Sequence, residues 1–83
     1  MNSRDLVLLS TTHCTLCERA LDVLLSMPEL RGRQLRVVDV VEDDALLERY
    51  GMRLPVLLAG ARELNWPFAA DDVAGFLRCA EAG

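Results

Sequence analysis

The chain has 83 residues, of which 52% are apolar, and a formal net charge of −4. This length predicts a single domain over residues 1–83, with enough apolar material for one packed core. No basic stripe interleaved with aromatic residues is present, which argues against nucleic-acid binding. The apolar runs are too short to span a membrane, and no secretory signal precedes the first of them.

The cysteine count indicates the redox compartment. Three cysteines are an odd number and do not form the paired framework of a small secreted protein. We therefore expect a reducing, cytoplasmic environment and a monomeric protein.

The first half of the chain predicts a strand, a helix and a second strand. Leu6 to Ser10 lacks polar alternation, so we expect a central strand that is buried on both faces. An amphipathic helix should follow and run to about Met27, where Pro28 stops it. Its expected apolar stripe comprises Leu16, Ala20, Leu21, Leu24 and Met27. The valine-rich segment 35–41 predicts a second strand, parallel to the first because a helix connects them.

The second half predicts a short helix, a hairpin and a last helix. Acidic residues 42–44 should begin the short helix, and Gly51 should follow its end. Its expected buried face comprises Leu46, Leu47 and Tyr50. Residues 56–58 and 63–64 predict a hairpin around 59–61, with the second strand at the sheet edge.

Asp71 is a plausible N-cap for the last helix. The residues expected to face inward from that helix are Val73, Phe76, Leu77 and Ala80. The order is therefore β-α-β-α-β-β-α, an α/β fold with one four-stranded mixed sheet flanked by three helices.

The segment Cys14-Thr15-Leu16-Cys17 places two thiols at the junction between the first strand and its helix. Free N–H groups at a helix N-terminus favour a thiolate over a thiol, and the thiolate is the nucleophile in disulfide exchange. Cys17 shares a helical face with Leu21 and Leu24, so it should point inward. We expect Cys14 to be the exposed, attacking thiol and Cys17 the resolving one.

Two further positions, His13 and Pro55, allow alternative interpretations. His13 could stabilise the thiolate or relay a proton, or it could be an ordinary solvent-facing turn residue. Pro55 could simply occupy the first position of a strand. Alternatively, a cis Leu54–Pro55 bond could present the N–H and C=O of Leu54 to an extended substrate.

The whole chain resembles the thioredoxin-like superfamily, and within it a small bacterial branch of glutaredoxin-like proteins. The resemblance is carried by the apolar strand, by the Cys14–Cys17 dithiol, by the approach to Pro55 over residues 49–57, and by residues 65–68 after the hairpin. It implies thiol–disulfide exchange, with Cys14 as nucleophile and Cys17 as resolving cysteine. It also implies Pro55 as the cis-proline and glutathione as a candidate reductant, whose cysteine would pair with Leu54 backbone atoms.

Several charged and aromatic residues could contribute to a substrate site. Arg49 and Arg53 could bind glutathione carboxylates, although the simpler interpretations are a helix C-terminal charge for Arg49 and a solvated loop charge for Arg53. Asp71 and Asp72 could hold a glutathione amine, although acidic residues are expected at a helix start in any case. Trp66 and Phe68 could line a substrate groove, but packing under the last helix is favoured. The candidate substrate-binding residues are therefore His13, Arg53, Leu54, Pro55, Asp71 and Asp72.

Three classes of function remain open on this sequence. The leading one is a dithiol oxidoreductase without a bound cofactor, acting on a disulfide-containing protein or a glutathione mixed disulfide. The second is zinc or iron–sulfur binding through the two cysteines, with His13 and Cys79 or a second subunit completing the site. The third is a thioredoxin-fold binding module whose dithiol does little turnover.

Overall fold

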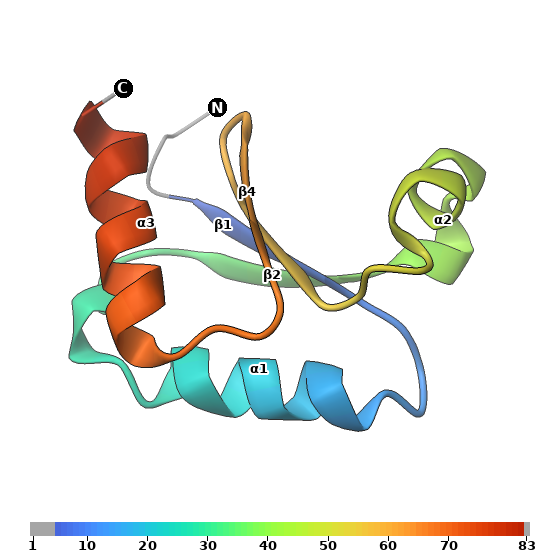
Figure 1. Cartoon of the computed structure of the whole chain (residues 1–83), viewed down its shortest axis with the longest axis horizontal. Helices are drawn as coiled ribbons and strands as arrows, with labels where there is room; N and C mark the ends of the chain where they lie inside the picture. The colour runs from blue at the N-terminus through green and yellow to red at the C-terminus, as the bar shows by residue number, and fades with distance from the viewer. Residues whose placement is uncertain (1–4, 83) are drawn as a thin grey trace.

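A four-stranded mixed sheet lies at the centre of the protein, in the computed structural model that describes residues 5–82, with side chains to residue 79 (Figure 1). The strands lie in the order β2-β1-β3-β4. Their bounds are β1 Leu6–Ser10, β2 Leu35–Asp39, β3 Val56–Ala59 and β4 Arg62–Asn65. β1 and β2 are parallel, whereas β3 is antiparallel to both β1 and β4. The predicted sheet, including the parallel pair and the edge position of β4, is confirmed.

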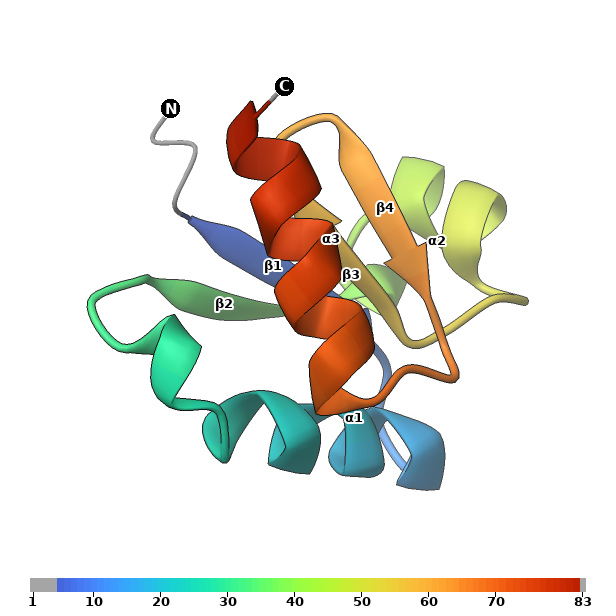
Figure 2. The same ribbon diagram turned by 60° about the vertical axis from the view of Figure 1, so that its left-hand side comes forward.

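Three α-helices cover the sheet within residues 5–82. They are α1 Thr15–Leu25, α2 Asp44–Tyr50 and α3 Ala70–Ala82, with 3₁₀ turns at Pro28–Leu30 and Val40–Glu42. Figure 2 shows α1 and α3 crossing one face of the sheet while α2 lies on the other. The chain order therefore matches the β-α-β-α-β-β-α prediction. Within residues 5–82, no helix combines the length and apolar character that crossing a bilayer requires.

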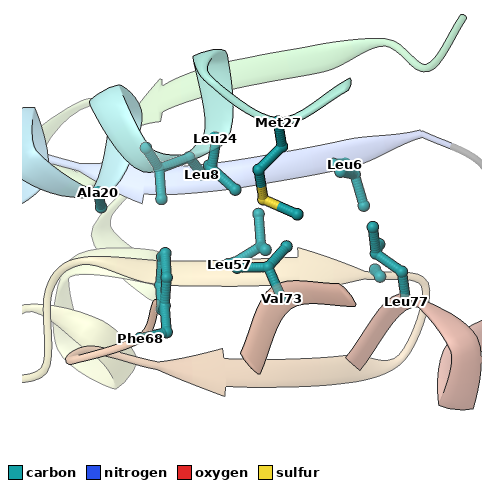
Figure 3. Packing of buried hydrophobic residues seen from close by; sticks show 10 residues of the cluster. Leu6, Leu8, Ala20, Leu24, Met27, Leu57, Phe68, Val73 and Leu77 are labelled. Carbon is teal, nitrogen blue, oxygen red and sulfur yellow. The ribbon is translucent and has the colours of Figure 1, made fainter. Parts of the chain in front are cut away.

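The main core lies between the sheet and the two helices α1 and α3. Figure 3 shows Leu8 of β1 beside Leu24 of α1, with Leu6 of β1 and Val73 of α3 in the same buried cluster. These side chains are at most 1% exposed. Ala20, Met27, Leu57, Ala59, Phe68 and Leu77 complete this buried cluster. Since β1 contributes to both faces of the sheet, its lack of polar alternation is explained.

A smaller core lies under α2 on the opposite face. Leu9 and Val56, which are direct partners in the β1–β3 ladder, pack there with Val40 and Tyr50. Leu54, Leu58 and other partly buried residues cover this cluster at its margin. The α2 face is therefore where the segment before β3 is attached to the sheet.

The expected ends of two elements were wrong by about two residues. β2 stops at Asp39 rather than residue 41, because the Asp39 carboxylate accepts a hydrogen bond from the Val41 N–H at 3.0 Å and begins a 3₁₀ turn. α1 stops at Leu25, and the Ser26 N–H bonds back to the carbonyl of Asp22 at 3.1 Å. Met27 is buried, as expected, but it lies beyond the helix.

Two leucines that were expected inside are partly exposed. Leu16 is 43% exposed because the inward stripe of α1 is centred on Cys17, Ala20 and Leu24, and position 16 lies on its flank. Leu47 is also 43% exposed, because Tyr50 occupies the inward position of the short helix α2.

The predicted cap of the last helix was also wrong. Helix α3 begins at Ala70, one residue before Asp71. Asp72, in the first turn, accepts a hydrogen bond from the Ala69 N–H at 2.8 Å. A carboxylate reaching back from the third helical position satisfies a free N–H as one half of a capping box does. Val73 and Leu77 are buried as expected, Phe76 is partly buried, and the side chain of Ala80 lies outside the described residues.

The hairpin between β3 and β4 is tighter than expected. Ala59 and Arg62 are ladder partners, so the connection is reduced to Gly60 and Ala61. Gly60 has a φ of 61°, a left-handed conformation that glycine adopts without a Cβ clash.

Candidate functional site

Cys14 and Cys17 lie at the junction between β1 and α1. The strand ends at Ser10, and Cys14 is the N-cap of the helix, with extended backbone angles. Between them, His13 adopts a left-handed φ of 59°. That conformation is rare for residues other than glycine but is enriched for histidine. His13 is exposed, which agrees with the solvent-facing turn interpretation, and it lies directly before the nucleophile candidate.

Cys14 and Cys17 form a disulfide, with their Cα atoms 5.2 Å apart. The Cys17 backbone N–H donates a hydrogen bond to Cys14 Sγ at 3.1 Å. The Cys14 carbonyl accepts the first intrahelical bond, from the Glu18 N–H at 3.1 Å. Cys14 therefore caps the helix through its sulfur, in the place where a serine or aspartate oxygen usually does so. A negative charge on this sulfur would be stabilised by that N–H and by the helix terminus.

The two sulfurs differ in accessibility. Cys17 is 5% exposed and belongs to the inward stripe of α1, whereas Cys14 is only half-buried. The asymmetry expected from the spacing of Cys17, Leu21 and Leu24 is present. Of the two cysteines, Cys14 is therefore the more accessible from solvent.

The Leu54–Pro55 segment lies at the same end of the sheet as the dithiol. Leu9 pairs with Val56 across the β1–β3 ladder, so Pro55 lies beside the point where β1 runs into the dithiol turn. The Trp66 N–H bonds to the Pro55 carbonyl at 3.3 Å. The Leu54–Pro55 and Trp66–Pro67 peptide bonds are both cis.

Leu54 has a free backbone at this position. Within residues 5–82, neither its N–H nor its C=O has a hydrogen-bond partner. Its side chain is partly buried against the cluster under α2. The side chain of Leu54 is thus attached to the fold while its peptide groups remain available to pair with another chain.

A cleft of about 220 Å³ opens on the other flank of the dithiol, between α1 and β2. His13, Cys14 and Cys17 line one end of it, and Leu21 and Val37 line the apolar wall. Val37 is 52% exposed because β2 is an edge strand that α1 only partly covers. The cleft therefore borders the dithiol on the β2 side, and the Leu54–Pro55 segment lies at the same end of the sheet on the β3 side.

Arg53 takes part in a cluster on the α2 face. Its guanidinium lies 3.6 Å from Glu63 of β4 and 5.0 Å from the centre of the Tyr50 ring. Arg49 makes equivalent approaches, at 3.6 Å to Glu63 and 5.4 Å to the Tyr50 ring. The Tyr50 hydroxyl donates a hydrogen bond to the Glu63 carboxylate. Arg53 is thus not a simple solvated loop charge, whereas Arg49 lies in the last turn of α2, as expected of a helix C-terminal charge.

These contacts shift the ionisation of both central groups. The hydrogen bond to Glu63, with burial, raises the pKa of Tyr50. The hydrogen bond from Tyr50, with the charges of Arg53 and Arg49, lowers the pKa of Glu63. Both groups therefore favour the state in which tyrosine donates and glutamate carries its charge.

The remaining candidates lie further along the chain. Asp71 and Asp72 are exposed in the first turn of α3, and Asp72 is engaged by the Ala69 N–H. Cys79 carries a free, exposed thiol. Across residues 5–82, no three or more His, Cys, Asp or Glu side chains are grouped in a way that could hold a metal ion.

Sequence reasoning missed Glu63 and underestimated Trp66. Trp66 packs against the main core and meets Phe68 edge-on, with ring centres 5.0 Å apart, so the favoured packing interpretation is confirmed. Its hydrogen bond to Pro55 was not anticipated. Glu63 gave no distinctive signal, because it lies between Arg62 and Leu64 in a short polar strand and its partners are distant in the sequence.

Comparison with known proteins identifies the family. The model of the glutaredoxin-like domain (DUF836) matches residues 5–78. The X-ray structure of Northeast Structural Genomics target protein XcR50 from X. campestris is 35% identical, with a TM-score of 0.76 over 89% of this chain and 96% of that one. The solution structure of the same target is also 35% identical, with a TM-score of 0.73 over 89% and 92%.

No curated protein matches the chain significantly. The family match covers most of the sequence, and the structural matches agree with it in fold. The fold is thioredoxin-like, and the chain belongs to the glutaredoxin-like (DUF836) family.

Proposed function

We propose that the protein is a thiol–disulfide oxidoreductase that acts through Cys14 and Cys17. The observation that carries the proposal is the N-cap geometry, in which the accessible Cys14 sulfur accepts the Cys17 N–H at 3.1 Å while Cys17 stays buried beside it. This arrangement favours a thiolate on the sulfur that substrate can reach. It also keeps the second sulfur within bonding reach of the first.

The reaction proceeds in two exchanges that balance in electrons and protons. The Cys14 thiolate attacks one sulfur of a substrate disulfide, forming a mixed disulfide and releasing the other sulfur as a thiolate that takes up a proton. Deprotonated Cys17 then attacks Cys14 Sγ and releases the second substrate thiol. The substrate gains two electrons, and the protein ends in the Cys14–Cys17 disulfide form described above.

The Leu54 peptide groups supply a place for the substrate chain. Their lack of a partner within residues 5–82 leaves one donor and one acceptor at the end of the sheet where the dithiol lies. An extended peptide around the substrate cysteine can pair with them as an added strand does. We propose a disulfide-containing protein or a glutathione mixed disulfide as substrate, and glutathione as the candidate reductant.

The other candidate residues have smaller proposed roles. His13 borders the cleft next to Cys14 and can contact a substrate there. Asp71 and Asp72 are candidates for a substrate amine, and Arg53 for a substrate carboxylate, although Arg53 already pairs with Glu63. We propose that the protein acts as a monomer in the cytoplasm.

Turnover of a model disulfide tests the proposal. The wild type, Cys14→Ser and Cys17→Ser are assayed with glutathione and its reductase, and separately with thioredoxin reductase alone. Cys14→Ser should abolish exchange with either reductant. Glutathione-driven activity that survives in Cys17→Ser indicates a monothiol route, whereas activity that needs both cysteines indicates a dithiol route. A wild type that exchanges with neither system would support a non-catalytic binding module instead.

A further inference from the structure

Glu63 joins three elements that are separate in the sequence. It lies on edge strand β4, where it pairs with Leu58 of β3 and faces α2. Its carboxylate accepts the Tyr50 hydroxyl at the end of α2. The same carboxylate lies 3.6 Å from the guanidinium of Arg53, in the loop that leads into β3. One carboxylate therefore connects the end of α2, the following loop and the sheet.

The loop held by this carboxylate contains Leu54. On one side of Leu54, β3 begins at Val56 and is fixed in the ladder with β1. On the other side, the Arg53 N–H bonds to the Tyr50 carbonyl at 2.8 Å, and its guanidinium reaches Glu63. Because the Leu54 peptide groups have no partner of their own within residues 5–82, these flanking contacts constrain their orientation.

Ion pairs and cation–π contacts of the two arginines add to the attachment of this loop to the sheet. The guanidiniums of Arg49 and Arg53 both lie over the Tyr50 ring, at 5.4 Å and 5.0 Å from its centre. The Tyr50 side chain is 6% exposed, so the ring is a rigid platform for both cations. The ion pairs are partly solvated, with Arg53 42% and Glu63 26% exposed, so they contribute little to global stability.

We infer that Glu63 is a positioning residue for exchange with peptide disulfides. Resting on the proposed function, this inference assigns Glu63 the task of holding Arg53 and Tyr50 so that the Leu54 peptide groups meet an extended substrate backbone. Glu63 itself contacts neither thiol and does not alter the chemistry at sulfur. Its loss should therefore weaken reaction with substrates that have a peptide backbone and spare those that have none.

The test is single-turnover kinetics with pre-reduced protein and excess disulfide, without any reductant. One substrate is a neutral disulfide of two short peptides with blocked ends, and the other is hydroxyethyl disulfide, which has no peptide group. The variants are Glu63→Gln and Arg53→Gln, with Glu48→Gln on the exposed face of α2 as the matched control. Both substrates are uncharged, so the altered charge of the variants does not bias the comparison.

Glu63→Gln should lower the second-order rate constant for the peptide disulfide roughly tenfold and leave that for hydroxyethyl disulfide within about twofold of wild type. Arg53→Gln should show the same selectivity, and Glu48→Gln should change neither rate. Alkylation of Cys14 should proceed at the wild-type rate in all three variants. These outcomes support a positioning role.

Other outcomes overturn the inference. Equal fractional losses on both substrates would indicate a general structural defect and not a positioning role. Wild-type rates on the peptide disulfide would show that the contacts of Glu63 do not reach Leu54. If the wild type reacts with neither disulfide, the proposed function itself fails, and that result is distinct from any failure confined to the variants.

Discussion

The backbone N–H of Cys17 points at the sulfur of Cys14 and lies 3.1 Å from it. In the proposed mechanism, the residue that resolves the mixed disulfide would thus also stabilise the attacking sulfur through its main chain. Replacing the Cys17 side chain leaves this N–H in place, so the nucleophile can be studied without its partner.

Alkylation rates should distinguish the two thiols. In reduced protein at neutral pH, iodoacetamide should modify Cys14 at least about tenfold faster than Cys17, because thiolate character and exposure together control reactivity. Peptide mapping by mass spectrometry measures both rates in one sample. The exposed thiol of Cys79 serves as the internal reference for an accessible cysteine outside the helix cap. Faster modification of Cys17 would contradict the assigned asymmetry.

Substitutions at His13 should distinguish the effect of its left-handed backbone conformation from any chemical role of its imidazole. The residue has a left-handed φ of 59°, which asparagine tolerates better than most residues and alanine does not. If the imidazole has no role, His13→Asn should match the wild type in exchange rate and Tm, and His13→Ala should lower Tm. A loss of exchange in His13→Asn at wild-type Tm would instead assign proton or charge chemistry to the imidazole. Steady-state rates and thermal melts of both variants provide the comparison.

The Tyr50–Glu63 pair should give stability a characteristic dependence on pH. The hydrogen bond from Tyr50 lowers the pKa of Glu63, so the contribution of this carboxylate is present above the unfolded-state pKa and is lost as pH falls through the folded-state pKa. The hydrogen bond to Glu63 raises the pKa of Tyr50, so its contribution is present below the ordinary tyrosine pKa and is lost as pH rises through the raised value.

Urea unfolding across this pH range measures both effects. The difference in free energy of unfolding between wild type and Glu63→Gln should be largest near neutrality and should shrink toward acid. Tyr50→Phe should remove the alkaline part of the dependence. Glu48→Gln, which changes one exposed carboxylate of α2, should run parallel to the wild type. A constant offset between wild type and Glu63→Gln at every pH would contradict the assignment.

Truncation of two adjacent leucines in α1 should change the free energy of unfolding by very different amounts. Leu24 is 1% exposed in the main core, whereas Leu25 is 70% exposed. Leu24→Ala should cost about 2–5 kcal/mol in free energy of unfolding, through lost burial and the cavity left behind. Leu25→Ala should change it by no more than about 0.5 kcal/mol, as surface substitutions usually do. Urea denaturation of the two variants gives both numbers, and equal effects would place the inward face of α1 incorrectly.

Local patterns in the sequence were sufficient for most of the fold. The apolar run from Leu6, the helix that begins at Cys14 and the crossover to the segment after Gln34 each depend on short-range chemistry. The asymmetry of the dithiol also followed from helical spacing alone. Leu16 was misplaced because periodicity gives the direction of a stripe but not its width, which depends on how far the sheet extends beneath the helix.

The contacts around Leu54 could not be predicted in the same way. Tyr50 and Glu63 are thirteen residues apart, and their pairing depends on α2 lying on the same face of the sheet as the Glu63 side chain. The capping of α3 by Asp72 was missed because two consecutive aspartates offer equivalent acceptors in the sequence. The residue at which the helix begins determines which of them reaches the Ala69 N–H. The Tyr50–Glu63 pairing needs the tertiary arrangement, whereas the Asp72 cap is a local contact that depends on the residue at which α3 begins.

The central claim is that Cys14 attacks the substrate and Cys17 resolves the intermediate. Intact-protein mass spectrometry after brief mixing of reduced protein with a peptide disulfide tests it most directly. Cys17→Ser should accumulate one peptide adduct, which fragmentation locates on Cys14, whereas Cys14→Ser should acquire none in the same time. An adduct on Cys17 in Cys14→Ser would contradict the account. Equal labelling of Cys79 and Cys14 in Cys17→Ser would also contradict it.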